Sequence, residues 1–505
     1  VMYALTGLIF LLIKPTNVSE SMTITASGFS TDFASNSFSS PFSILITYEI
    51  FLSGKSSLII FEKPDRDFLM FGSSNRFLTV FIASSKLIKN TKETINYSKI
   101  FFKWDLLRCY SGRIHVVLDM YSYNGRIAII DLSKRRVRTI ELKENVLRMF
   151  IGGAGLGAYL FLDLIGNRYP EPFSEDNPLI FMTGPLTGTI APASGRHAVI
   201  SRSPLTSIFG EATSGGFFGV ELKKTGYDGV VLLGSSERPV YVFIDDGEIS
   251  FHDAKDLWGL GTYETMRSIR KDLGKNVKVA CIGPAGENLV RYSAIMNDDG
   301  RAAARTGLGA VMGSKKLKAI AVLGEKEISV YSEEFFEYSR ELSRVLAESI
   351  SAMTLRELGT AGYFEVGYEF GDIPGKYFMS LDFDPEALSG TRLNELFHVT
   401  PKACFACPIG CGREVKLDGL VVHGPEYETL AALGSLNLIM NIDIVVRANH
   451  MCNDLGLDTI STGVTIAFLN YLVEKGIISG KDANISWGSG EGLLRIIRMI
   501  AHREG

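Results

Sequence analysis

Three cysteines lie close together in the segment KACFACPIGC. Cys404, Cys407 and Cys411 follow C-x2-C-x3-C spacing and make up half of the six cysteines in this 505-residue chain. Thiolates are soft ligands that suit zinc and iron–sulfur centres. A compact triplet favours a [4Fe–4S] cluster, which cysteine thiolates hold. Pro408 and Gly410 suit the tight turn that such a loop needs.

The triplet leaves one cluster ligand unaccounted for, so other interpretations stay open. Structural zinc sites usually add a second, distant ligand pair to C-x2-C. A zinc loop completed by His423 or Cys452 is one alternative, and three buried thiols without a metal are another. So few clustered cysteines do not indicate a secreted disulfide scaffold; they favour a cytoplasmic protein with a metal or redox site.

Glycine-rich turns form a second group of candidate sites. The segments SGGFFGVELKKTGYDG and IGPAGEN adjoin predicted strands, and such turns expose backbone N–H groups that can bind phosphate. Neither is a G-x-G-x-x-G motif before a helix, so a Rossmann dinucleotide site is not indicated. IGGAGLGAYLF also lacks that spacing, and close packing of a helix N-terminus on a sheet explains it equally well.

Two arginines lie among small residues in NDDGRAAARTGLGAVMG. We expect Arg301 and Arg305 to lie one turn apart, where the neighbouring Ala and Gly allow close approach of a bulky ligand. Arginine can bind phosphate or a polar heterocycle through its planar fork. An ordinary surface helix carrying cations is the alternative.

The elements that must position these groups change in type along the chain. Short β-rich runs bounded by Gly and Pro predict strands from 121 to about 325, and helical periodicity follows, starting with SEEFFEYSRELSRVLAESI. The predicted fold class is α+β. A β-rich domain of two sheets spans 120–327, and a mostly α-helical domain spans 328–505. Residues 1–119 are predicted to be a low-complexity, poorly packed extension, from a start codon placed too early or a fusion; a genuine N-terminal domain is the alternative.

Composition limits the classes of partner. With 46% hydrophobic and 21% charged residues and a net charge of −4, nothing favours nucleic acid or an anionic membrane. The N-terminal stretch VMYALTGLIFLLI is shorter than the ~20 residues of a spanning helix. It also lacks the basic start and cleavage site of a signal peptide, so neither feature is predicted.

Seven segments together resemble the tungsten-containing aldehyde:ferredoxin oxidoreductase family. The resemblance runs from Met120 to Gly505, and its blocks occur in this order: GPLTGTIAPASGRHAVISRSPLT, SGGFFGVELKKTGYDG, IGPAGENLV, NDDGRAAARTGLGAVMGSKKLKAIAV, CFACPIGCGR, GPEYETLAALG and ANHMCNDLGLDTISTG. The resemblance implies tungsten or molybdenum bound by two pterins, a [4Fe–4S] cluster, and magnesium bridging the pterin phosphates. It implies oxidation of small aldehydes to carboxylic acids, with ferredoxin accepting the electrons.

The resemblance also assigns roles to individual residues. Cys404, Cys407 and Cys411 match the cluster ligands, and Glu428 matches a carboxylate that assists proton transfer. Without the resemblance, Glu428 is more simply a solvated or ion-paired helix residue. The pterin-contacting positions match Arg196, Ser214, Gly215, Gly216, Arg301, Ala302, Ala304, Asn453, Leu457 and Asp458.

Several positions depart from the family pattern. Asn453 replaces an Asp that accepts from the pterin amines, with Asp454 beside it as an alternative acceptor. Thr213 stands where some members have Asn. Arg447 and Leu494 occupy positions where some members hold an iron between subunits, so we expect no such iron, and any homodimer would use other contacts.

The resemblance places the fourth cluster cysteine and an active-site histidine in a C-terminal domain. We expect that domain to be absent from this chain, which leaves two alternatives to an active aldehyde oxidoreductase. One is an inactive, incomplete member of the family, and the other is a zinc-loop binding protein. The sequence selects neither the aldehyde nor tungsten over molybdenum.

Overall fold

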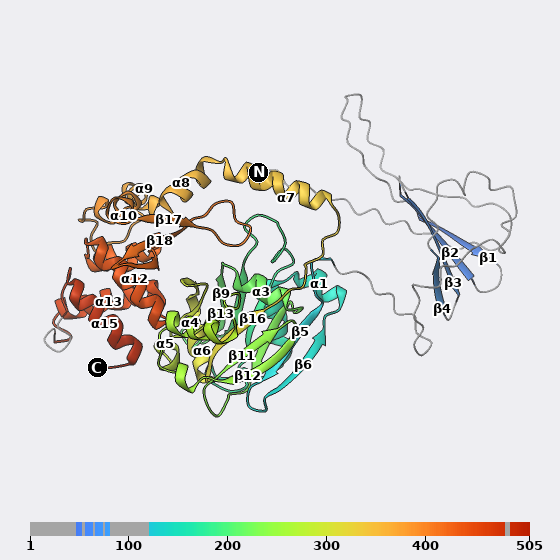
Figure 1. The fold of residues 1–505 in the computed structure, drawn as a ribbon, viewed down its shortest axis with the longest axis horizontal. Coiled ribbons are helices and arrows are strands. Elements are labelled where there is room, and N and C mark those ends of the chain that lie inside the picture. Colours follow the sequence, from blue (N-terminus) through green and yellow to red (C-terminus); the bar gives the residue numbers. More distant parts are fainter. Residues whose placement is uncertain (1–46, 53–55, 64–65, 74–75, 81–120, 480–484) are drawn as a thin grey trace, which may run out of the picture. The chain divides into compact units, whose positions relative to one another are not determined.

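The computed structural model describes residues 47–479, with gaps at 53–55, 64–65, 74–75 and 81–120, and residues 485–505 (Figure 1). Contacts divide the chain into two compact units, Val1–His115 and Val116–Gly505. Each unit is described by itself. The N-terminal apolar stretch and the serine-rich run that follows it lie outside the described residues.

The first unit contains an antiparallel sheet of four strands in the order β1-β2-β3-β4. The strands are β1 (Thr47–Leu52), β2 (Ser56–Lys63), β3 (Arg66–Ser73) and β4 (Arg76–Val80). The sequence analysis predicted no strands here, although the runs are rich in Ile, Leu and Phe, which suit pleated sheets. The assignment of residues 1–119 as an extension stays a prediction.

The second unit begins with a six-stranded sheet in the order β6-β5-β10-β7-β8-β9. Its pairs are antiparallel except β5 with β10, and β7 and β8 are buried on both faces. Helices α1 (Glu144–Phe150) and α2 (Gly153–Ile165) cover one face. The strands are β5 (Arg126–Asp131), β6 (Arg136–Glu141), β7 (Leu179–Thr183), β8 (His197–Arg202), β9 (Phe209–Ser214) and β10 (Gly229–Leu233).

A second six-stranded sheet has the order β12-β11-β16-β13-β14-β15. One apolar core joins the two sheets and includes α3 (Phe218–Lys224) and α6 (Leu308–Ser314), while α4 (Thr262–Leu273) packs on the other face of the second sheet. The strands are β11 (Val240–Asp245), β12 (Glu248–Asp253), β13 (Lys278–Cys281), β14 (Ile295–Asn297), β15 (Arg301–Ala303) and β16 (Leu317–Leu323). The predicted two-sheet region is therefore confirmed.

Two glycines of IGGAGLGAYLF allow helix α2 to pack closely on the first sheet. A Cβ atom on Gly157 would overlap Ile200 of β8, and one on Gly152 would lie 2.9 Å from the Cα of Gly184. These contacts let α2 approach the sheet closely. Close packing therefore explains Gly152 and Gly157 of this motif.

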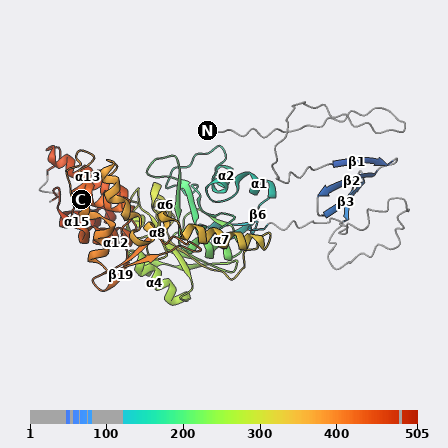
Figure 2. The same ribbon diagram turned by 90° about the horizontal axis from the view of Figure 1, so that it is seen from above.

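Helices dominate after residue 333, as predicted (Figures 1 and 2). The longer ones are α7 (Glu334–Ala347), α8 (Ile350–Leu358), α12 (Ile442–Leu455), α13 (Thr459–Glu474) and α15 (Gly490–His502), with α9 (Phe364–Glu369) and α10 (Gly390–Leu396) between them. A small sheet interrupts them, built from β17 (Val399–Lys402), β18 (Gly412–Leu417) and β19 (Leu420–His423). The predicted helix in PEYETLAALGSLNLI is irregular: α11 (Tyr427–Thr429) leads into a π-helical turn, Leu430–Gly434.

No helix in the described part of the chain is, by itself, long and apolar enough to cross a lipid bilayer. Two helix pairs reach that length only together, across bends of 119° and 118°.

Candidate cofactor and cluster site

The cysteine loop connects β17 to β18 and rests on two segments of the β-rich region. The Phe405 N–H donates to the carbonyl oxygen of Gly216 over 3.2 Å, and the Ala406 carbonyl accepts from the Ala193 N–H at 3.1 Å. A Cβ atom on Gly215 would lie only 2.8 Å from the Cys404 Sγ. Cys404 and Gly215 of the predicted pterin loop, 189 residues apart in the chain, are therefore in direct contact.

Arginine side chains hold the cysteine loop from the helical side. Arg413 is buried, and its Nη2 donates to the carbonyl oxygens of Gly410 (2.7 Å) and Leu355 (2.8 Å). In return, Arg356 Nη2 donates to the Pro408 carbonyl at 2.6 Å. These bonds tie the end of α8 to the cysteine loop and satisfy carbonyl groups that β17 and β18 leave unpaired.

The three thiols are half-buried and free of disulfides. Burial, with smaller contributions from Glu426 and the other two thiols, raises the pKa of the Cys411 thiol, and Arg301 opposes that rise. Gly410 has a φ of 68°, which fits the expected tight turn. Nearby cations and a turned backbone fit an anionic iron–sulfur cluster.

The two residues considered as a further zinc ligand differ in position: His423 lies opposite Glu414 in the strand pair that follows the cysteine loop, and Cys452 lies in a helix. Cys452 is fully buried in the core of the helical region, and the His423 side chain packs against Gly300. Within the described ranges, no three His, Cys, Asp or Glu side chains converge on one metal-ion position. The same holds for the cysteine triplet itself among the described residues.

Glu426 is a carboxylate beside the loop that the sequence analysis did not single out. Its Oε2 accepts from the Thr360 hydroxyl at 2.5 Å, and its Oε1 lies 3.8 Å from Arg301 Nη1. Arg301 also donates to the Lys402 carbonyl at 3.2 Å. Glu426 lies two residues before Glu428 in the same GPEYE motif, and only tertiary contacts distinguish the two.

The predicted pterin loop is the sharp turn between β9 and α3. The Ser214 hydroxyl donates to Asn297 Oδ1 at 2.7 Å, and Asn297 Nδ2 donates to the Gly215 carbonyl at 3.0 Å. Gly216 has a φ of 103° and lies directly against the Asp298 carboxylate. Asn297 and Asp298 lie within the segment NDDGRAAARTGLGAVMG, and the sequence pattern assigned neither residue a role.

Arg196 is exposed beside this loop. Its Nη2 donates to the Thr213 hydroxyl at 2.9 Å, and a Cβ atom on Gly215 would lie 3.6 Å from its Nη1. Thr213, which replaces the Asn of some relatives, therefore orients a predicted pterin-contacting arginine.

Arg301 and Arg305 are not on one helix, which corrects the expectation of a helical turn between them. Arg301 begins strand β15, whereas Arg305 begins a 3₁₀ turn, Arg305–Gly307. Ala302 and Ala304 are half-buried between them. The hairpin with β14 sets the strand conformation, and the two arginines reach different partners as a result.

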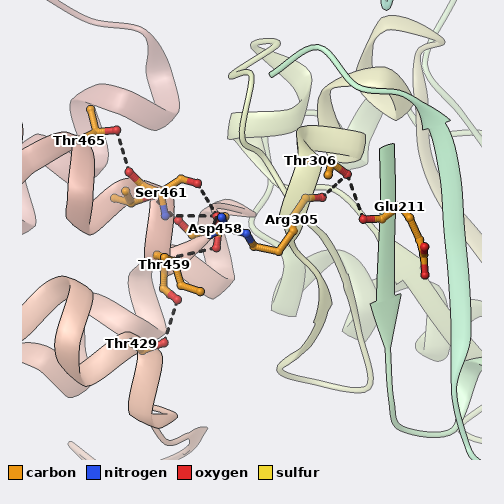
Figure 3. Close-up of polar contacts among 10 residues, drawn as sticks. Glu211, Arg305, Thr306, Thr429, Asp458, Thr459, Ser461 and Thr465 are labelled. Atoms are coloured by element: carbon orange, nitrogen blue, oxygen red, sulfur yellow. Dashed lines mark hydrogen bonds and ion pairs between the residues drawn. The ribbon is translucent and has the colours of Figure 1, made fainter. Parts of the chain in front are cut away.

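Arg305 contacts the second predicted pterin loop (Figure 3). Its Nη1 lies 3.1 Å from Asp458 Oδ2, and the two side chains point toward one another from the β-rich and helical regions. Asp458 is buried and caps α13 by accepting from the N–H groups of Ile460 and Ser461, both at 3.2 Å. A predicted pterin-contacting residue thus already has a cap and an ion-pair partner.

The rest of this second loop lies against the β-rich region. Leu457 is buried and forms a β-bridge with Ser293, and Asn453 is buried at the end of α12. Asp454 Oδ1 accepts from the Tyr263 N–H at 3.3 Å, and its carboxylate packs on Gly261 at the start of α4. Asp454 therefore binds the start of α4, and its role as an alternative acceptor stays a prediction.

Glu428 is exposed in α11. The next residue, Thr429, shares a 2.8 Å hydrogen bond with the hydroxyl of Thr459, which follows Asp458 (Figure 3). The segment carrying Glu428 therefore lies beside the start of α13. Of the two positions compared with a bridging-iron site, Arg447 forms ion pairs with Asp418 and Asp443, and Leu494 packs on the helical core.

Comparison with known proteins identifies the family of this fold. Residues 127–324 match the model of the aldehyde ferredoxin oxidoreductase N-terminal domain, and residues 337–505 match the model of domains 2 and 3. The chain belongs to the aldehyde ferredoxin oxidoreductase family. The second match corrects the expectation that the family's C-terminal domain is absent, because residues 337–505 match the model of domains 2 and 3.

Individual family members show the extent of the similarity. The tungsten-containing aldehyde ferredoxin oxidoreductase of Pyrococcus furiosus is 42% identical over 396 residues, and that of Thermococcus kodakarensis is 41% identical over 394. Each alignment covers 76% of this chain and 65% of the relative, so the chain spans about two thirds of the length of these relatives.

A solved structure of a different enzyme has the same fold. The BamBC active-site complex of benzoyl coenzyme A reductase, solved with 1,5-dienoyl-CoA, matches with a TM-score of 0.68 at 28% identity. The match covers 76% of this chain and 61% of that one. The shared fold therefore extends beyond relatives named for aldehydes, and fold alone does not select the substrate.

Proposed function

We propose that this family member is an oxidoreductase that converts small aldehydes into carboxylic acids and passes the electrons to ferredoxin. One observation carries the proposal: the cysteine loop rests on the predicted pterin loop, with the Cys404 Sγ 2.8 Å from the position of a Gly215 Cβ. A cluster in one loop and a cofactor in the other would be adjacent, as electron transfer between them requires. The aldehyde and ferredoxin come from the similarity to tungsten-containing aldehyde ferredoxin oxidoreductases.

The surrounding residues suit the cofactors that this function needs. A tungsten or molybdenum bis-pterin would supply the two-electron oxidation chemistry. Gly215 and Gly216 let the loop backbone lie directly against Cys404 and Asp298, where a Cβ atom would not fit, and Arg196 and Arg301 bring cations for phosphate. Ser214, Ala302, Ala304, Asn453, Leu457 and Asp458 complete the proposed pterin-binding set.

Cys404, Cys407 and Cys411 would hold the [4Fe–4S] cluster. The carbonyl groups of their loop are bound by Arg356 and Arg413, which keeps the turn in place and provides positive charge beside it. Magnesium between the pterin phosphates, a homodimer without a bridging iron and a cytoplasmic location stay predictions.

Glu428 is the proposed proton acceptor. Oxidation of an aldehyde with water yields a carboxylic acid, two electrons and two protons, so a carboxylate near the reacting carbon can accept one proton. Glu428 is exposed next to Thr429, whose hydrogen bond with Thr459 fixes this segment beside Asp458. An inactive chain and a zinc-loop binding protein are the competing functions.

Metal analysis and activity distinguish these functions. Protein prepared without oxygen should contain iron, tungsten or molybdenum, and pterin, and should reduce methyl viologen with at least one of a panel of aldehydes. Cys407→Ser should lose iron, while Cys281→Ala, which alters a buried thiol in β13, should keep it. Zinc in place of iron would favour the binding protein, and a fully loaded but silent preparation would contradict aldehyde oxidation.

A further inference from the structure

The turn between β14 and β15 lies next to the predicted pterin loop and has an uncommon backbone. Asp298 and Asp299 adopt φ angles of 50° and 56°, followed by Gly300 at 133°. Consecutive left-handed residues other than glycine persist only where surrounding contacts hold them, and such positions gather at functional sites. The contacts of the Asp298 side chain stabilise this backbone conformation.

The Asp298 carboxylate concentrates three hydrogen bonds on one oxygen. Its Oδ2 accepts from the N–H groups of Phe217 (2.6 Å) and Phe218 (3.0 Å) and from Asn297 Nδ2 (2.8 Å). Asp298 is 8% exposed, so these bonds form in a site largely shielded from water. Charge-assisted bonds of this kind are stronger than neutral ones.

The same carboxylate restricts position 216. A Cβ atom on Gly216 would overlap Asp298 Oδ2, and the φ of 103° at this residue also favours glycine. The loop backbone therefore lies in van der Waals contact with the carboxylate. Residues 214–217 cannot shift toward the hairpin, and shifting away would break the bonds to Phe217 and Phe218.

The opposite side of the loop bears on the cysteines. The Gly216 carbonyl accepts from the Phe405 N–H at 3.2 Å, and Gly215 lies under Cys404. Asn297 adds a bond to the Gly215 carbonyl at 3.0 Å. The turn, the pterin loop and the cysteine loop are thus stacked in contact.

We propose that Asn297 and Asp298, here called the hairpin clamp, position residues 214–217 for pterin binding. They are positioning residues, because their polar atoms form hydrogen bonds with the loop backbone and with the Ser214 hydroxyl. The inference rests on the proposed function and deepens it. The cysteine loop has its own support from Arg356 and Arg413, so loss of the clamp should reduce pterin retention more than cluster retention.

The first test compares two neighbouring aspartates. Asp298→Ala should lower the molar ratio of pterin to iron about ten-fold, the scale on which supporting residues act in metal sites. Asp299→Ala is the matched control: Asp299 is also left-handed, but its carboxylate pairs with Arg270 at 2.8 Å and touches none of the loop. That variant should keep the wild-type ratio.

A second readout does not depend on cofactor. Amide hydrogen exchange at Phe217 and Phe218 should be about ten-fold faster in Asp298→Ala than in wild type or Asp299→Ala, since each amide loses a charged acceptor. Asp298→Asn keeps one acceptor oxygen without the charge and should give intermediate exchange and retention. If Asp298→Ala does not accumulate as folded protein, the asparagine variant replaces it in both measurements.

The outcomes separate this inference from the proposed function. Wild-type protein without pterin would overturn the proposed function, while the exchange measurement would still test the clamp. Pterin retained normally in Asp298→Ala, or lost equally in Asp299→Ala, would overturn the clamp and leave the function standing. Equal loss of iron and pterin in Asp298→Ala would also contradict it, because the cysteine loop should hold its cluster.

Discussion

The pterin loop and the cysteine loop touch, yet the chain holds them in place by different means. The pterin loop extends from β9, which pairs with β8, and is fastened by the hairpin of β14 and β15. The cysteine loop lies at the edge of a three-stranded sheet, and the side chains of Arg356 and Arg413 bind its carbonyl groups. The amide and carboxylate side chains of a hairpin turn hold the pterin loop, whereas two arginine side chains hold the cysteine loop.

The β-rich and helical regions also differ in what stabilises a buried cation. In the β-rich region, Lys318 pairs with Glu287, and the exposed fractions of these side chains are 0% and 4%. In the helical region, the hydrogen bonds of the buried Arg413 go to carbonyl oxygens, three of them within 2.8 Å. A carboxylate balances the first charge, while the carbonyl dipoles at the end of α8 stabilise the second.

Removing one member of the buried ion pair should have the largest effect. Lys318→Met leaves the Glu287 carboxylate buried without its cation and should lower the free energy of unfolding by about 3–5 kcal/mol. Urea unfolding of the two proteins measures the difference. The double variant Lys318→Met/Glu287→Gln removes both charges and should recover most of the loss; a double variant as unstable as the single one would show that packing, and not charge, dominates.

Removing the Arg413 cation beside the cysteine loop should lower the free energy of unfolding by less than Lys318→Met does. It should lower the metal content more. Arg413→Met removes the side-chain donor of the Gly410 and Arg356 carbonyls and one of the two donors of the Leu355 carbonyl, and it should lower the free energy of unfolding by about 2–3 kcal/mol. Iron content should fall as the loop loosens. Arg413→Lys restores the charge without the planar fork and should recover only part of both. Unchanged iron in Arg413→Met would remove the contrast between the loops.

The contact between the two regions at Asp458 should be weaker and asymmetric. Asp458→Ala removes the cap of α13 and should cost about 1–2 kcal/mol. Arg305→Ala removes only the ion pair, and because its side chain is 55% exposed the loss should stay below about 1 kcal/mol. Chemical unfolding of both variants tests this order. Equal losses would mean that the ion pair, rather than the cap, stabilises the contact.

Buried histidines should lower the stability of the protein in acid, and single variants can measure the contribution of each histidine. Burial, with a contribution from Arg196, lowers the pKa of His197 to about 3. The unfolded chain binds a proton near its ordinary pKa while the folded chain does not, so stability is present above about pH 6.5 and falls toward pH 3, by up to about 1.4 kcal/mol per pH unit for each such group. Burial lowers the pKa of His423 to about 3 as well.

His197→Leu should therefore flatten the acid slope by one proton without loss at pH 7. Both ring nitrogens of His197 are buried without a hydrogen-bond partner, so an apolar replacement abandons no bond. Urea unfolding between pH 7 and pH 4 gives the slope. A slope identical to that of wild type would show that His197 is already protonated in the folded protein.

Local patterns predicted much of the fold from residue 121 onward. Gly- and Pro-bounded apolar runs marked strands such as β7 and β10, and helical periodicity marked α12 and α13. The same reasoning failed at Arg301 and Arg305, where an Ala-rich run suggested a helix and pairing with β14 produced a strand. It also missed the strands of residues 47–80, whose polar and serine-rich flanks obscured short apolar runs.

The cysteine spacing, the change from strands to helices and the ordered motifs depend on residues near one another in the chain, so the sequence by itself determined the family, and it predicts an iron–sulfur site. Which carboxylate lies beside the cysteines was decided by tertiary structure. Glu426 rather than Glu428 meets Arg301, and Asp298 rather than Asp299 meets the pterin loop, because folding brings segments 80 to 125 residues apart into contact. Two neighbouring acidic residues of the same type cannot be distinguished by their chemistry in the sequence. They differ only in the direction that the backbone gives their side chains.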